Sequence, residues 1–562
     1  MESKKSSLMK EGVSRIVSRG LMKAAGFGDR EIANPLIGIV SSWTDAFPGH
    51  MHLNSLSQAV AQGIYAGGGT PMTFSTIAIC DGYCSGLESM KYSLPSRELI
   101  ADSIEAVVNA HNFDALVFVC ACDKIVPGML MAAGRLDLPC IFVNGGPMLP
   151  GRHGGQQLDL TDFGRVAGGL LTGKITKEEY DTVENNACPG SESCAGMFTA
   201  NSMGCMTEVL GIALPGNGTI PAVDSARIRL ARDSGRRVVE LCRKDLKPSD
   251  IMTKKAFENA IAVDILLGCS TNTVLHLPAI ASELGIRVRL EHFDRIGDIV
   301  PSVCHISPAG KFYLVDLHDV GGMPALMKQG LNGGMLHGSC KTVVAESLAE
   351  QLRDVTVTNS DIIRPLNDPY LPNGGLTILK GNLAPVGAVI KANAVDDNMF
   401  THRGVAKVFN SEKEASAALM AGKVEKGDTV VIRYEGPKGG PGMQEMAVFI
   451  AVMQGMGLDD GISLVTDGRF SGITRGASIG HVCPEAYDGG PIALIENGDV
   501  IEYDIKSKTL NVLVSEEELA NRLTRWVRPE PKYNRGYLAK YIQEVSSVYE
   551  GAVTNPMKVD NI

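Results

Sequence analysis

The sequence predicts an α/β protein in two parts: a large N-terminal α/β domain with a mainly parallel sheet, and a smaller strand-rich, barrel-like C-terminal domain. Three observations support this. Short apolar runs alternate with helix-like segments through the first two thirds of the chain, which is typical of βαβ layers. The last third is rich in strand-like segments. The chain also has 562 residues, more than the roughly 250–300 at which a single core stops growing, so at least two domains are expected.

The N-terminal sheet is predicted from three apolar runs that read as buried strands. They are LIGIV around 37–40, ALVFVC at 115–120 and CIFVNGG at 140–146. Parallel strands covered on both faces by helices have continuous apolar runs of this kind. A helical pattern over 53–65 supplies a crossover between the first run and the second.

A domain boundary is expected within residues 358–375, which hold three prolines and little periodicity. The N-terminal domain is therefore assigned to 1–360 and the C-terminal domain to 374–562. After the boundary come the strand-like segments VGAVIKANAV, GVAKVFN, TVVIRYEG, ISLVTDG and IALIENGDVIEYDI. The Asn-Gly-Asp of the last segment predicts a tight hairpin. Ser515 and Glu518 have capping-box spacing, so a helix is expected after it.

Charge and apolar patterning exclude several classes of partner. The net charge is -10 and no Lys/Arg-rich stripe is present, which argues against a nucleic-acid partner. No run approaches the roughly 20 apolar residues that span a bilayer, and the first residues lack the apolar core of a signal peptide. We therefore expect a cytoplasmic protein without a membrane segment. Its 13 cysteines lack the regular spacing of a disulfide scaffold, so reduced thiols are expected.

Three cysteines are candidates for chemistry: Cys80, Cys122 and Cys194. Each ends or follows a strand-like run and is followed at once by charge or glycine. Active-site groups in open α/β sheets gather at the carboxyl ends of strands. The thiols are too scattered for the CxxC pairs of a zinc site, and they suit an iron-sulfur cluster assembled in a cleft, with one iron left open as a Lewis acid. The alternative is that they are buried structural thiols.

Carboxylates accompany these thiols directly. Asp81 follows Cys80, and Asp123 with Lys124 follows Cys122. A hard cation such as Mg²⁺ prefers oxygen ligands, so a second metal beside the cluster is chemically reasonable. The alternative is that each Asp serves as a turn residue or helix cap.

Two glycine-rich loops of the C-terminal part surround polar groups. YEGPKGGPGMQEM contains Glu445, and VTDGRFSGITRG contains Asp467, Arg469 and Ser471. Glycine lets the backbone approach a ligand closely. From the residues alone, Ser471 is a nucleophile, a base or an N-cap.

Over nearly its entire length the chain resembles the dihydroxy-acid dehydratase / 6-phosphogluconate dehydratase family, and most closely the dihydroxy-acid dehydratase branch. The strings that carry the resemblance are long. They include KYSLPSRELIADSIE, CDKIVPGMLMAAGRL, FVNGGPM, SCAGMFTANSM, ALPGNGTIPAV, GNLAPVGAVIK, GGPGMQEM and TDGRFSG.

The resemblance implies a hydro-lyase that converts a 2,3-dihydroxy carboxylic acid to a 2-keto acid in valine and isoleucine synthesis. It implies an iron-sulfur cluster, either 4Fe-4S or 2Fe-2S, on Cys122 and Cys194. It also implies homodimers or homotetramers. It also implies a Mg²⁺ site formed by Asp81, Asp123, Glu445 and a carbamylated Lys124. Ser471 falls at the position of the family's catalytic base.

The third cluster ligand differs among members of that family. Many carry Cys where this chain has Gly49, and those that instead read Pro-Gly-His there often have the Cys-Asp-Gly seen at Cys80. We therefore assign the third thiolate to Cys80, with Cys84 as the competitor.

Three departures bear on the substrate, and one of them is Ser191-Glu192, which stands where Cys-Gly is common in the family. Leu87 stands where the family usually has His, and Val344, Ala345, Glu346 and Ser347 replace a Thr-Gly-Lys-Thr segment. If these residues line the pocket, a sugar-acid (aldonate) dehydratase is the alternative function. A non-catalytic cluster-binding sensor is a third hypothesis, and retention of the expected base and metal ligands argues against it.

Overall fold

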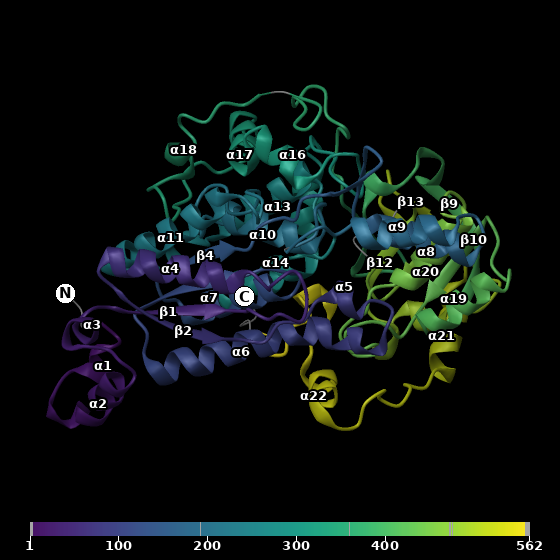
Figure 1. Cartoon of the computed structure of the whole chain (residues 1–562). Helices are drawn as coiled ribbons and strands as arrows, with labels where there is room; N and C mark the ends of the chain where they lie inside the picture. Colours follow the sequence, from purple (N-terminus) through teal and green to yellow (C-terminus); the bar gives the residue numbers. More distant parts are fainter. Residues whose placement is uncertain (1–3, 192, 359, 471–473, 475, 557–562) are drawn as a thin grey trace.

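The computed structural model of the chain describes residues 4–191, 193–358, 360–470, 474 and 476–556 (Figure 1). The first part of the chain builds a parallel sheet covered by helices, and the last part builds a second, larger sheet. The predicted fold class is confirmed in both parts. The domain boundary placed between residues 360 and 374 stays a prediction.

The N-terminal sheet has four strands in the order β2-β1-β3-β4, and all neighbouring pairs are parallel. Its strands are β1 (Leu36–Ser41), β2 (Thr70–Ser75), β3 (Ala115–Cys120) and β4 (Cys140–Asn144). Every residue of β1, β3 and β4 is buried. The continuous apolar runs that predicted these three strands follow from this burial on both faces.

Two helices cross closely over one face of this sheet, α4 (Leu53–Gly67) and α11 (Ser225–Lys244), while α6 (Ser93–His111) covers the other (Figure 1). Glycine makes the crossing possible. A Cβ added to Gly63 would lie 1.9 Å from the carbonyl oxygen of Arg232. The helical pattern predicted over 53–65 is confirmed as α4.

The C-terminal sheet has eight strands in the order β14-β13-β9-β10-β11-β12-β8-β7. Its four central strands, β9 to β12, run parallel to one another, and the pairs outside them are antiparallel. The strands are β7 (Thr377–Leu379), β8 (Gly387–Ile390), β9 (Thr401–Phe409), β10 (Asp428–Ile432), β11 (Ser463–Thr466), β12 (Ser478–Cys483), β13 (Val500–Asp504) and β14 (Thr509–Val512).

The two edges of this sheet almost close on each other. Immediately after β7, Lys380 N donates to Lys508 O at 3.0 Å, and Leu510 N donates to Lys380 O at 2.9 Å. A bridge between Lys380 and Thr509 therefore joins the first and last strands. Closure of this kind removes exposed edges, and the barrel-like shape expected from the sequence is confirmed.

One predicted hairpin is wrong and one predicted cap is right. The apolar segment before Asn497 forms a short 3-10 helix, Pro491–Leu494, and not a strand. Asn497 instead accepts a hydrogen bond from Val408 N at 2.7 Å, which anchors the turn to β9. Ser515 does cap the helix α21 (Glu516–Arg525), because its hydroxyl accepts from Glu518 N at 3.2 Å.

The last described segment returns to the N-terminal part after α22 (Gly536–Glu544) (Figure 1). There the buried Arg97 donates to the carbonyl oxygens of Gly551 at 2.8 Å and Ala552 at 2.7 Å. This return packs the end of the chain against α14 (Thr273–Glu283). Within the described ranges, no helix combines the length and apolar character needed to cross a bilayer.

Candidate functional site

Three carboxylates from both parts of the chain converge. Asp81 begins the short helix α5 (Asp81–Cys84), Asp123 follows β3, and Glu445 lies just before α20 (Ala447–Met456). One oxygen atom from each carboxylate lies within 4.8 Å of those of the other two. Ionised carboxylates only accept hydrogen bonds and repel one another, so this arrangement requires positive charge among them.

Two buried cationic side chains supply that charge. Lys124 Nζ lies 2.8 Å from Asp81 Oδ2 and also forms an ion pair with Asp123. Arg469 Nη1 lies 3.2 Å from Glu445 Oε1, and its Nη2 lies 3.9 Å from Asp81 Oδ2. Both cationic side chains are fully buried. Oxygen ligands gathered in this way are the kind that Mg²⁺ takes, and a divalent cation here would replace part of this charge.

The carboxylates differ in acidity. Burial alone would raise the pKa of Asp81, but the positive charges of Lys124 and Arg469 outweigh burial and lower it. Burial raises the pKa of Asp123 to about 7, and the negative charges of Asp81 and Glu445 add to the rise. Asp81 is therefore ionised at neutral pH, whereas Asp123 titrates near neutrality until a cation occupies the site.

The candidate cluster cysteines lie beside these carboxylates, because Cys80 and Cys122 directly precede Asp81 and Asp123 in the chain. The thiols of Cys80 and Cys122 hydrogen-bond to each other, which lowers the pKa of Cys80 and raises that of Cys122. Burial raises the pKa of Cys194, and the charge of a Cys80 thiolate would raise it further. Cys194 interacts electrostatically with both Cys80 and Cys122, so the three thiols lie in one neighbourhood.

The backbone around Cys122 is unusual. Its φ of 64° lies in the left-handed region, which residues other than glycine rarely adopt. Gly49 faces it: a Cβ added there would lie 2.8 Å from Cys122 Sγ. The missing side chain leaves space directly beside the sulfur.

Two further cysteines are near the cluster candidates but are held differently. Cys84 is on the same short helix as Asp81, and its thiol donates to Cys80 O at 3.2 Å. Burial raises the pKa of Cys84 to about 12, and burial raises that of Cys188 to about 11. Both thiols are therefore protonated, whereas Cys80 is the thiol whose pKa is lowered.

Two residues that hold the carboxylates were not predicted from the sequence. Ser93 Oγ donates to Asp81 Oδ1. Asn272, which precedes α14, donates from Nδ2 to Glu445 Oε1 at 3.3 Å. The only local signal was their position: each stands where a helix begins after a polar or glycine-containing turn.

Other candidates lie apart from this cluster. The Asp467 carboxylate accepts from the backbone N–H groups of Glu435 at 3.0 Å and Ala486 at 2.9 Å, so it anchors a loop. Leu87 is 58% exposed, and Val344 and Glu346 are also exposed. These substituted positions therefore lie on the surface of the single chain. Ser471 lies outside the described residues.

Comparison with known proteins gives a consistent result over the whole chain. A family model described as the Dihydroxy-acid/6-phosphogluconate dehydratase N-terminal region matches residues 34–351, and the corresponding C-terminal model matches residues 361–552.

Individual relatives match over almost their full length. A protein named dihydroxy-acid dehydratase from Caldanaerobacter subterraneus subsp. tengcongensis is 54% identical over 549 residues, which cover 98% of this chain and 99% of the relative. A protein of the same name from Pyrococcus abyssi is also 54% identical over 549 residues, with the same coverage. One from Acetivibrio thermocellus is 52% identical over 549 residues, again covering 98% and 99%.

Proposed function

Because the chain belongs to the dihydroxy-acid/6-phosphogluconate dehydratase family, we infer that it is a hydro-lyase that converts a 2,3-dihydroxy carboxylic acid to a 2-keto acid and water. Its full-length likeness to dihydroxy-acid dehydratases identifies it as one of them. One structural observation supports the same chemistry. The carboxylates of Asp81, Asp123 and Glu445 meet directly beside the paired thiols of Cys80 and Cys122.

The first part of the proposal is a Mg²⁺ site formed by Asp81, Asp123 and Glu445. The donor set fits, because three carboxylate oxygens come together and, among the described residues, Lys124 and Arg469 are the cationic side chains that form ion pairs with them. Carbamylation of Lys124 would convert a buried amine into a fourth anionic ligand. When bound, Mg²⁺ supplies positive charge for the substrate carboxylate while negative charge develops on it.

The second part is an iron-sulfur cluster, either 4Fe-4S or 2Fe-2S, on Cys80, Cys122 and Cys194. The fit rests on the contact between the Cys80 and Cys122 thiols and on the space that Gly49 leaves beside Cys122 Sγ. When bound, a cluster with three thiolates offers an open iron as a Lewis acid for the departing C3 hydroxyl.

Ser471 is proposed as the base that removes the proton from C2. In the sequence it stands two residues after Arg469, whose guanidinium contacts Glu445. A serine has too high a pKa to act as a base in water, so the positive charge of the site would have to stabilise its alkoxide. Arg469 also excludes water from behind the carboxylates, because it is fully buried.

The specific substrates proposed are 2,3-dihydroxy-3-methylbutanoate and its ethyl homologue, the precursors in valine and isoleucine synthesis. The full-length likeness to proteins named dihydroxy-acid dehydratase supports this choice. A cytoplasmic location and a homodimer or homotetramer complete the proposal.

The test is anaerobic purification followed by keto-acid detection across C4 to C6 dihydroxy and polyhydroxy acids. Turnover of the branched dihydroxy acids is expected. Preference for an aldonate would favour the sugar-acid dehydratase, and absence of turnover with an intact cluster would favour the sensor.

A further inference from the structure

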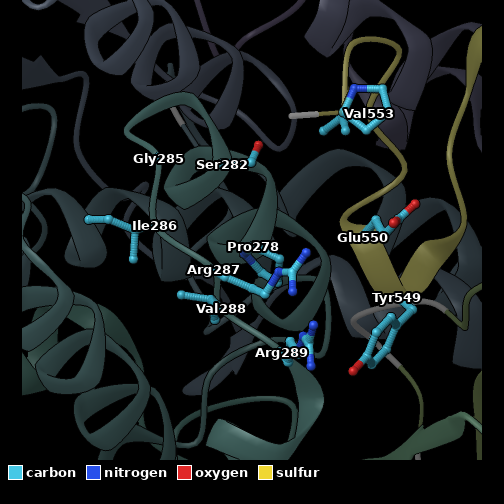
Figure 2. Close-up of a pocket in the computed structure, with 11 residues that line it drawn as sticks. Pro278, Ser282, Gly285, Ile286, Arg287, Val288, Arg289, Tyr549, Glu550 and Val553 are labelled. Atoms are coloured by element: carbon cyan, nitrogen blue, oxygen red, sulfur yellow. The ribbon is translucent and has the colours of Figure 1, made fainter. Parts of the chain in front are cut away.

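A small cavity lies near the C-terminal half of α14, whereas the N-terminal end of this helix is next to the proposed metal site. The cavity is bounded by α14, by the chain that follows it and by the last described segment. Its volume is about 150 Å³. Figure 2 shows the side chains of Arg287 and Arg289 extending from one side toward the segment that carries Tyr549 and Glu550. Two like charges are thus held together at one opening.

Neither guanidinium has a hydrogen-bond or ion-pair partner among the described residues. Glu550 also lines the cavity, so the lining carries one carboxylate against two guanidiniums and keeps a net positive charge. Glu291 forms an ion pair with Lys380 at 3.1 Å and accepts from Tyr549 OH at 3.1 Å. Two adjacent guanidiniums that exceed the carboxylate charge beside them form a site for a planar anion, since each offers a fork of N–H donors.

Apart from Ser282, Tyr549 and Glu550, the remaining wall of the cavity is apolar. Pro278, Val288 and Val553 line it, and Val553 is 1% exposed. A cavity of about 150 Å³ is the size that accommodates benzene in an engineered apolar core, which sets the scale of the ligand at roughly six to eight heavy atoms. The apolar part of the wall therefore complements a ligand that carries a short aliphatic chain next to its anionic group.

We propose that this cavity binds a small aliphatic carboxylate, with its carboxylate between Arg287 and Arg289 and its aliphatic part against Val288 and Val553. The site is separate from the proposed metal centre and does not depend on the proposed function.

Binding here would tie together segments that also reach the metal centre. The helix α14 begins next to Asn272, which donates to Glu445 at 3.3 Å. One turn further along, His276 contacts Arg97 at 3.2 Å, and Arg97 holds the carbonyl oxygen of Gly551 at 2.8 Å. A ligand that joins the end of α14 to the last segment should therefore raise the melting temperature in a concentration-dependent way.

The test is calorimetric titration of the purified enzyme with isovalerate, a branched carboxylate without the hydroxyl groups of the substrate. Wild-type protein should bind it, and Arg287→Gln and Arg289→Gln should each weaken binding at least about tenfold, the effect of losing one charge-assisted hydrogen bond. Arg295→Gln is the matched control, because this arginine lies on the neighbouring helix and pairs with Glu258 at 3.2 Å, away from the cavity. Its affinity should equal that of wild type.

Glu445→Gln separates the two possible locations of the ligand. Binding that survives in Glu445→Gln but weakens in both cavity variants supports the proposal. Binding that is lost in Glu445→Gln and kept in both cavity variants places isovalerate at the metal centre and overturns it. Inorganic phosphate is the second titrant: if it binds in an arginine-dependent way while isovalerate does not bind, the assignment to an aliphatic carboxylate is wrong.

Discussion

Replacement of Gly49 by alanine should remove the iron-sulfur cluster with little effect on the fold. The backbone of Gly49 is not in the left-handed region, so alanine is allowed there. Its Cβ would lie 2.8 Å from Cys122 Sγ, and the sulfur must move by at least about 0.6 Å to reach an ordinary contact of 3.4 Å. Protein ligand distances at metal sites hold to about ±0.2 Å, so this displacement is about three times what coordination tolerates.

The cost to stability should be small, because the atom that moves is the end of a side chain. An off-rotamer thiol costs roughly 0.5–1.5 kcal/mol. Gly82→Ala is the matched control, since its Cβ would lie 3.8 Å from Cys80 Sγ, an ordinary contact.

The assay is iron and acid-labile sulfide per chain, with the visible absorbance, in anaerobically prepared protein. Gly49→Ala should lose most of its cluster with a melting temperature close to wild type, and Gly82→Ala should keep it. Full cluster content in Gly49→Ala would refute the assignment of Cys122 Sγ as a ligand held at this position.

Three further predictions concern the proposed ligands and base. Cys80→Ser should lose iron and sulfide, whereas Cys84→Ser should keep them. The Cys80 thiol hydrogen-bonds to the Cys122 thiol, and the Cys84 thiol donates a hydrogen bond to a backbone carbonyl. Glu445→Gln should lower kcat and retain the cluster absorbance. The loss should exceed the roughly 10- to 100-fold effect of removing a residue that only hydrogen-bonds to a metal ligand, because Glu445 is proposed as a ligand itself. Ser471→Ala should lower kcat by at least about 10² with metal content and melting temperature unchanged, whereas loss of an N-cap would cost roughly 1 kcal/mol and leave turnover intact.

Each of these has an opposing outcome. Cluster loss only in Cys84→Ser would move the third ligand to that residue. Loss of colour together with turnover in Glu445→Gln would give this side chain a structural role. Exchange of the substrate C2 hydrogen with solvent deuterium at the wild-type rate in Ser471→Ala would exclude it as the base.

The continuous apolar runs located the strands β1, β3 and β4. Both faces of these strands are buried, so apolar and polar residues do not alternate along them. The same reasoning failed at Asn497, where a turn signal was present but the preceding apolar residues form a 3-10 helix. Ile492 and Leu494 are buried in this 3-10 helix, and residues two apart would also share one face of a strand. Their hydrophobicity therefore did not determine the backbone.

The sequence by itself determined that thiols and carboxylates lie side by side, since Cys80–Asp81 and Cys122–Asp123 are covalent neighbours at the ends of predicted strands. Only the tertiary structure decided that Glu445 joins them, that Arg469 balances its charge and that Asn272 holds it. The physical reason is range. Strand and helix patterns arise from contacts between residues a few positions apart. This site depends on packing the C-terminal sheet against the loops of the N-terminal sheet, and the hydrophobic periodicity of a short segment contains no information about that packing.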